Sequence, residues 1–276
     1  MERLRMVARA GEEGPGLVAQ EAAAALAACA GDPPSLVIAC RRLVDHQPTS
    51  GPVWWLAARV LAAPDPTAEA WRSAAELEDD PTPAACAYHL AEEALVTVVG
   101  WPEQVAAALR RRGDCRVLAV DAPVGGGPAG RRRRAGNDVV VVADSGLGSA
   151  AAAADLVLLE ARVLGPGGFV ATAGSLAAAA VGQASGVPVW VVAGAGRVLP
   201  GALWDALVAR LAQDPEPWDS GYDVVPLRLA DRVVGPAGPG PAEDAPARAD
   251  CPPVPELTRS WAAPGSRGRG PLADRG

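Results

Sequence analysis

The stretch ADLVLLEARVLGPGGFVATAGSLAAAAVGQASGVPVWVVAGAGRVLP, residues 154–200, decides the fold. It holds two short apolar runs, at 156–159 and 189–193, separated by glycine-rich turns and an alanine-rich segment. Continuous apolar runs of this length are typical of strands buried on both faces of a parallel sheet, and alanine favours a helix. The stretch therefore predicts buried strands joined by a helix.

Residues 163–196 also carry no charged side chain, and a segment of that length can span a bilayer. Pro166, Pro188 and several glycines divide it into pieces too short to cross a membrane. We therefore expect a buried helix followed by a buried strand, and no membrane span.

Similar apolar runs occur earlier in the chain, at 95–99, 116–120 and 139–143, and a helix is predicted between the first two, at 102–113. Strand and helix alternating in this way predict a Rossmann-like, doubly wound parallel sheet. Apolar patterns and proline breaks before it predict four helices, at 17–30, 35–46, 52–62 and from about residue 66.

The predicted fold class is therefore α/β, in three parts. Residues 1–90 form an N-terminal helical domain and residues 91–235 a Rossmann-like α/β domain. Residues 236–276, rich in Pro, Gly and Arg, are predicted to be a disordered tail.

Composition limits the classes of function. The 276-residue chain has a formal net charge of −7 and no lysine, which argues against direct nucleic-acid binding. Five scattered cysteines without a CxxC pair favour a reducing compartment, and the charged N-terminus lacks the apolar region of a secretory signal. We expect a cytoplasmic protein without a metal site.

A dinucleotide-like motif follows the run at 139–143: Gly146 and Gly148, with Ala151 three residues later, fit G-x-G-x-x-A. Glu160 ends the next predicted strand. However, the next strand begins soon after Gly148, whereas a dinucleotide-binding unit needs about thirty residues. Both interpretations remain open here: a nicotinamide site, or a turn tightened by glycine.

A phosphate site is predicted at Thr172, Gly174 and Ser175, because small residues at a helix N-terminus expose N–H groups to an anion. A serine that simply caps the helix explains the same residues. Arg197 follows the strand at 189–193, at the edge where α/β sheets bind ligands, and is a candidate for a charge-assisted contact.

Two acids end predicted strands, Asp144 and Glu160, and are the candidate catalytic carboxylates; strand-end acids also cap helices. The run Arg131–Arg134 suits a solvated loop, or a contact with phosphate or a partner. His46 and His89 have no metal-ligand spacing and are assigned structural roles.

Four short motifs follow one another within residues 154–200: Leu159-Glu160-Ala161, Pro166-Gly167, Gly174-Ser175 and Gly186-Val187-Pro188. Their order resembles the signature shared by the α, β and δ subunits of initiation factor 2B and by methylthioribose-1-phosphate and ribose-1,5-bisphosphate isomerases. The late segment Tyr222–Pro226 and the helical segment at 46–61 extend the resemblance over about residues 17–236.

The sequence differs from the isomerase pattern at the positions of its catalytic and phosphate-binding residues. Ala161 stands where the isomerases have a catalytic aspartate, and residues 97–101 lack their catalytic cysteine. Ala122 replaces the arginine of their phosphate motif, and Ala171-Thr172 replaces Asn-Lys. Aldose–ketose isomerisation needs groups that move protons, so we expect this chemistry to be lost.

The resemblance implies a non-catalytic regulatory or scaffold protein that is at least a dimer, pairing with a second copy or a related subunit. A residual crevice for a sugar phosphate or nucleotide is expected at Thr172, Gly174, Ser175 and Arg197. One alternative is a sugar-phosphate isomerase with a relocated acid, Glu160 or Asp144. Another is an NAD-binding oxidoreductase; no bound cofactor is predicted otherwise.

Overall fold

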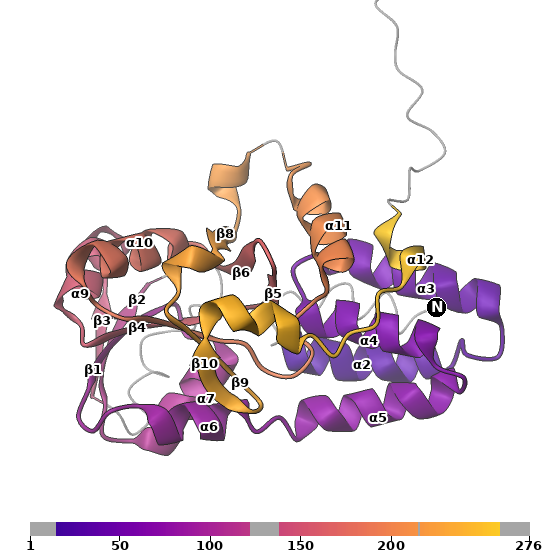
Figure 1. Ribbon diagram of the computed structural model, residues 1–276, viewed down its shortest axis with the longest axis horizontal. Helices are drawn as coiled ribbons and strands as arrows, with labels where there is room; N and C mark the ends of the chain where they lie inside the picture. The colour runs from indigo at the N-terminus through magenta and orange to yellow at the C-terminus, as the bar shows by residue number, and fades with distance from the viewer. Residues whose placement is uncertain (1–14, 122–137, 215, 260–276) are drawn as a thin grey trace, which may run out of the picture.

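The computed structural model describes residues 15–121, 138–214 and 216–259 (Figure 1). The first part of the chain is helical. Most of these helices have a proline in the first turn, where its missing N–H costs no hydrogen bond. They are α2 (Pro15–Ala27), α3 (Pro33–His46), α4 (Gly51–Ala62), α5 (Pro66–Glu78) and α6 (Thr82–His89). The four predicted helices are confirmed, and α6 is an addition.

Helix α4 is the centre of this helical layer. Its residues Val53, Trp54, Trp55 and Leu56 are all fully buried, and α2, α3 and α5 pack around it. The indole N–H of Trp54 donates to the carbonyl of Pro48, so the polar edge of this ring is satisfied inside the layer. This central position explains why α4 is apolar on nearly all sides, with Arg59 as its single charged residue.

The main sheet has seven strands in the order β10-β9-β7-β4-β1-β2-β3. Every neighbouring pair is parallel except the antiparallel pair β9–β10. The strands are β1 (Leu95–Val99), β2 (Arg116–Val120), β3 (Asp138–Val142), β4 (Leu156–Glu160), β7 (Val189–Val192), β9 (Arg232–Gly235) and β10 (Gly238–Pro241). The chain runs outward from β1 to β3 and then resumes on the other side with β4. The predicted α/β class with a doubly wound, mostly parallel sheet is confirmed.

Helices cover both faces of this sheet. On one face, α6 and α7 (Glu103–Arg112) pack on Val96 and Val98 of β1. On the other, α9 (Leu147–Ala153) and α10 (Ser175–Ser185) pack on Val157 and Leu159 of β4. Burial on both sides explains why the strands are continuously apolar instead of alternating.

A second, three-stranded sheet of β5 (Val163–Gly165), β6 (Gly168–Thr172) and β8 (Tyr222–Pro226) is antiparallel and was not predicted. Strands β5 and β6 precede α10 and β7, which are the predicted buried helix and strand of the uncharged stretch, and β8 follows them. Helix α11 (Gly201–Leu211) packs against this sheet. Within the described ranges, no helix is long and apolar enough to cross a membrane.

The disordered tail predicted from residue 236 is wrong for residues 238–258. Strand β10 pairs with β9, η5 (Ala242–Arg248) follows, and α12 (Pro255–Thr258) returns to the N-terminal helices beside α3 (Figure 1). Backbone pairing and a few buried side chains, Val254 and Leu257 among them, are enough to order this segment despite its Pro- and Gly-rich composition. Residues 260–276 of the predicted tail lie outside the described residues.

Candidate functional site

The carboxyl ends of β1 and β4 form the topological switch point of the sheet, because the strand order reverses between them. Open α/β sheets bind ligands in the crevice beyond this point. Here the first turns of α4 and α7 and the segment that follows β7 lie at this point. The structure therefore places a candidate site where helical layer and sheet meet.

Glu160 and Arg197, both proposed from the sequence, do meet at this point. Arg197 Nη1 donates to Glu160 Oε1 at 2.8 Å and to the carbonyl of Ala161 at 2.7 Å. The two side chains are 4% and 2% exposed. Arg197 therefore pairs with Glu160 inside the protein. It is not a solvated surface residue, as a single arginine usually is.

The second oxygen of Glu160 is also engaged. Glu160 Oε2 accepts the backbone N–H groups of Gln104, at 2.8 Å, and Val105, at 3.0 Å, in the first turn of α7. An acidic side chain at a helix N-terminus satisfies free N–H groups and complements the helix dipole. The carboxylate therefore performs the capping role that an external anion would have at this helix.

Three buried polar atoms at the same place have no hydrogen-bond partner among the described residues: Ser50 Oγ, Gln104 Oε1 and Arg197 Nε. Ser50 precedes α4, and the next residue, Gly51, donates its N–H to the carbonyl of Arg162 at 3.0 Å. Buried polar atoms are usually paired, so this group has unused capacity for a polar ligand or water. None of these roles was predicted for Ser50 or Gln104.

Arg162 adds a second guanidinium beside Glu160. Burial is the main cause that lowers the pKa of Arg162 from its usual value; Arg197 adds to the effect and Glu160 opposes it. Two guanidinium groups, those of Arg162 and Arg197, therefore act on the Glu160 carboxylate.

Asp80 connects the helical layer to the sheet, a role that the sequence did not reveal. Its Oδ2 accepts from Gln104 Nε2 at 2.6 Å and from the N–H of Ala195 at 2.9 Å, while Oδ1 accepts from the N–H and hydroxyl of Thr82. The only local signal is that Asp80 comes before a proline-rich helix start, where acids are common caps.

The predicted phosphate site at the start of α10 is occupied by a side chain of the protein. Asp223 Oδ2 accepts the N–H groups of Gly174, at 2.9 Å, and Leu176, at 2.8 Å. Gly174 is the N-cap, with φ of 96°, and Ser175 is the first helical residue, so a serine cap does not explain the motif. A phosphate at Thr172, Gly174 and Ser175 would have to displace Asp223, which lies in the Tyr222–Pro226 segment already noted for its resemblance.

Asp144 lies apart from the other candidate residues. It is exposed at the carboxyl end of β3, where its Oδ1 accepts the N–H of Ser145. Strands β2 and β1 separate β3 from β4, and three strand spacings of about 4.8 Å each leave Asp144 too far from Glu160 to act with it as a pair.

The dinucleotide-like glycines lie at the same edge strand, in η2 (Asp144–Gly146) and at the start of the short helix α9. Helix α9 (Leu147–Ala153) has seven residues, so the unit is far shorter than the roughly thirty residues that a dinucleotide-binding motif needs. The run Arg131–Arg134 falls outside the described residues. Within those residues, no three His, Cys, Asp or Glu side chains gather in a group that could hold a metal ion.

No protein-family model matches the sequence, and no curated protein matches it. Solved structures do match. Translation initiation factor eIF-2B from Pyrococcus horikoshii OT3 aligns with a TM-score of 0.70 and 15% identity over 86% of this chain and 95% of that one. A chain of the tetrameric eIF2B-beta2-delta2 complex from Chaetomium thermophilum aligns with a TM-score of 0.70 and 15% identity, covering 89% and 91%.

A 5-methylthioribose 1-phosphate isomerase from P. horikoshii OT3 also aligns, with a TM-score of 0.59 and 15% identity over 87% of this chain and 83% of that one. The chain therefore has the fold common to initiation factor 2B subunits and this isomerase, as the sequence motifs implied. Identities this low establish the fold and leave the activity to be argued from the site.

Proposed function

We propose that this protein is a non-catalytic regulatory or scaffold protein built on the initiation factor 2B fold. The observation that supports this most directly is the state of Glu160, the acid at the switch point. Both of its oxygens are engaged, one by Arg197 and the other by the first turn of α7.

An aldose–ketose isomerase needs an acid and a base within hydrogen-bond reach of the substrate carbons. Glu160 would have to leave an ion pair and two backbone hydrogen bonds before it could accept a substrate proton. The next residue, Ala161, has no group that moves protons, and residues 97–101 contain no cysteine. The fold matches that of the isomerase, whereas these positions lack its chemical groups.

A residual ligand role for the crevice fits the same geometry. The guanidinium groups of Arg162 and Arg197, together with the unpartnered Ser50 Oγ and Arg197 Nε, suit a phosphate group of a sugar phosphate or nucleotide. In this proposal the ligand stabilises one form of the protein and is not converted.

The proposed partner is a second copy of the chain or a related subunit, in line with the subunit complex among the structural matches. A reducing compartment such as the cytoplasm suits this role, since all five cysteines are free thiols. Light scattering on the purified protein should then give at least twice the chain mass of 27.9 kDa, whereas a monomer at micromolar concentration would contradict the pairing.

Catalysis is tested with 5-methylthioribose 1-phosphate and ribose 1,5-bisphosphate as substrates. We expect no aldose–ketose conversion above the rate without protein. Turnover that disappears in Glu160→Gln and persists in the exposed variant Asp144→Asn would overturn the proposal and establish the alternative, an isomerase with a relocated acid.

Ligand binding is tested by thermal shift with the same sugar phosphates, nucleoside monophosphates and NADH, because a ligand that prefers the folded state raises the melting temperature. A shift with a phosphate compound that Ser50→Ala diminishes supports the crevice. A shift with NADH that the phosphate compounds do not produce would instead favour the oxidoreductase alternative.

A further inference from the structure

A separate cavity of about 600 Å³ opens between helices α4 and α5 and the carboxyl ends of β7 and β9. Its volume is within the range of roughly 300–1,000 Å³ usual for small-molecule sites. Its lining includes none of Glu160, Thr172, Gly174, Ser175 and Arg197. The cavity is therefore distinct from the crevice proposed above.

The floor of the cavity is apolar. It consists of the segment 193–196 after β7, together with Val198, Val233 and Ala245. A Cβ atom at Gly194 would meet Asp80 and Gln104, so this segment separates the cavity from the polar contacts around Glu160. The floor offers an apolar surface for the hydrocarbon part of a ligand.

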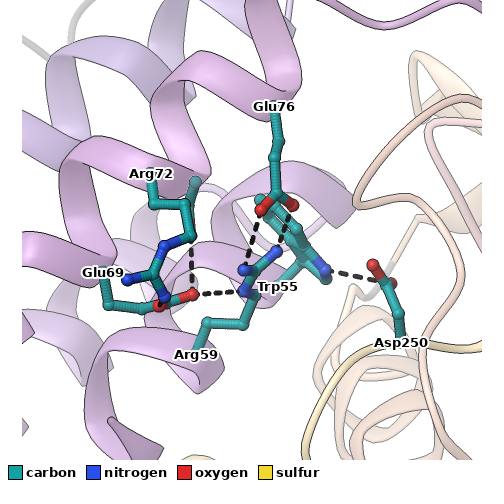
Figure 2. A network of polar contacts seen from close by, with 7 residues as sticks. Trp55, Arg59, Glu69, Arg72, Glu76 and Asp250 are labelled. Carbon is teal, nitrogen blue, oxygen red and sulfur yellow. Dashed lines mark hydrogen bonds and ion pairs between the residues drawn. The ribbon is translucent and has the colours of Figure 1, made fainter. Parts of the chain in front are cut away.

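Charged side chains form the wall on the α5 side, and most of them already have partners (Figure 2). Arg59 binds Glu69 and Glu76 and stacks over the Trp55 ring at 4.4 Å, and Arg72 binds Glu69. Two arginines and two glutamates make this network neutral. It stiffens the wall and contributes no net charge to the cavity.

The other charges at the cavity are Asp79, Asp250 and Arg248, which have no ion-pair partner among the described residues. Asp250 uses one oxygen, Oδ1, to accept the Trp55 indole N–H at 3.0 Å, which leaves its second oxygen for another donor (Figure 2). The Arg248 guanidinium lies against the backbone of Gly240 in β10. Two carboxylates against one arginine give the cavity a net negative charge.

We propose that this cavity binds a small molecule with an apolar body and a protonated amine. The body lies on the floor formed by 193–196 and Val233, and the ammonium donates to the carboxylates of Asp79 and Asp250. Charge-assisted hydrogen bonds of this kind orient the ligand, while burial of its hydrocarbon part supplies the driving force.

The test is calorimetric titration of the full-length protein with three probes of similar shape and different charge: phenethylamine, phenethyl alcohol and 3-phenylpropionate. We expect phenethylamine to bind most tightly and its affinity to fall as salt rises, because exposed charges are screened. Equal affinities, or tighter binding of 3-phenylpropionate through Arg72 and Arg248, would overturn the proposed ligand class.

Variants test the position of the site. Asp79→Asn and Asp250→Asn should each weaken phenethylamine binding by up to about five-fold, as expected for a solvent-accessible ion pair. Ala75→Trp, at an exposed position of α5 that lines the cavity, should block it. Glu78→Gln removes one charge from the same helix outside the lining and is the matched control. Binding that survives Ala75→Trp, or that Glu78→Gln weakens as much as Asp79→Asn, would place the amine elsewhere.

Discussion

At the scale of single residues, two carboxylates each hold the first turn of a helix. Glu160 holds Arg197 and the first turn of α7, and Asp223 holds the first turn of α10. A buried ion pair is a weak source of net stability, yet removing one partner leaves the other charge unpaired in a low-dielectric interior. We therefore expect the removal of either acid to destabilise the fold.

Glu160→Ala should lower the free energy of unfolding by about 3–5 kcal/mol, because Arg197 would remain buried without its carboxylate. Urea denaturation followed by circular dichroism measures this effect. Asp144→Ala, at an exposed strand-end acid, is the control and should change the value by no more than about 0.5 kcal/mol. Comparable losses in the two variants would contradict the burial argument.

The cysteines predict a pH dependence at the same scale. Burial raises the pKa of Cys40, Cys86 and Cys251 to about 12, whereas a thiol in the unfolded chain has a pKa of about 8.5. Below the pKa of the unfolded chain, the thiols are protonated in both the folded and the unfolded state, and the free energy of unfolding is at its full value. As pH rises towards 12, the unfolded state loses protons first, so the stability of the fold declines.

Each of these thiols should contribute a slope of up to about 1.4 kcal/mol per pH unit over this window. Urea unfolding between pH 8 and 11 measures the slope, and Cys86→Ala should make it shallower. The absence of lysine and the presence of just two tyrosines leave few other groups to titrate there. An unchanged slope in Cys86→Ala would show that burial does not control this thiol.

At the scale of elements, the β5–β6 hairpin is defined by close packing against α11. A Cβ atom at Gly165 would lie far inside van der Waals contact with Cγ of Trp204. The glycine is required because the hairpin backbone lies directly on the indole ring. Gly148, by contrast, lies in α9 with open space around it.

Two alanine substitutions should therefore have opposite effects. Gly165→Ala should destabilise the protein by about 1–3 kcal/mol through overpacking. Gly148→Ala should stabilise it by up to about 1 kcal/mol, because alanine is the better helix former. Thermal or urea unfolding of both variants decides the matter. Destabilisation by Gly148→Ala would mean that this glycine has a role that its open surroundings do not show.

At the scale of the whole molecule, the C-terminal segment joins the sheet to the helical layer. After β10 pairs with β9, the chain returns to α3 and α11, where Arg41 Nε donates to the carbonyl of Glu256 at 2.7 Å and Arg210 Nη2 to that of Leu257 at 3.1 Å. Leu257 is fully buried in the core of the N-terminal helices. Segments far apart in sequence thus share one core.

Leu257→Ala should lower the free energy of unfolding by about 2–4 kcal/mol, because it leaves a cavity at this junction. The half-exposed Leu176→Ala on α10 is the matched control and should cost less than about 1 kcal/mol. Both values come from urea denaturation. A small effect of Leu257→Ala would mean that the C-terminal segment contributes little to the shared core.

The sequence by itself determined the local elements, because their signals lie within a few residues. Continuous apolar runs predicted β1, β2, β3, β4 and β7 close to their observed bounds, and proline breaks predicted α2 to α5. After residue 236, the many glycines and prolines predicted disorder. The structure is ordered there because the segment pairs with β9 and contacts distant helices. The same is true of the second sheet, whose strands β6 and β8 are far apart in the chain.

The tertiary structure alone decided what the site residues do. Arg197 and Glu160 were both named from the sequence, but their pairing depends on two strands meeting in the sheet. Asp223 reaches the start of α10 across 47 to 49 residues, and Asp80 reaches Ala195 across 115. Such contacts have no local pattern, since a carboxylate forms the same hydrogen bonds with any N–H that the fold brings within about 3 Å.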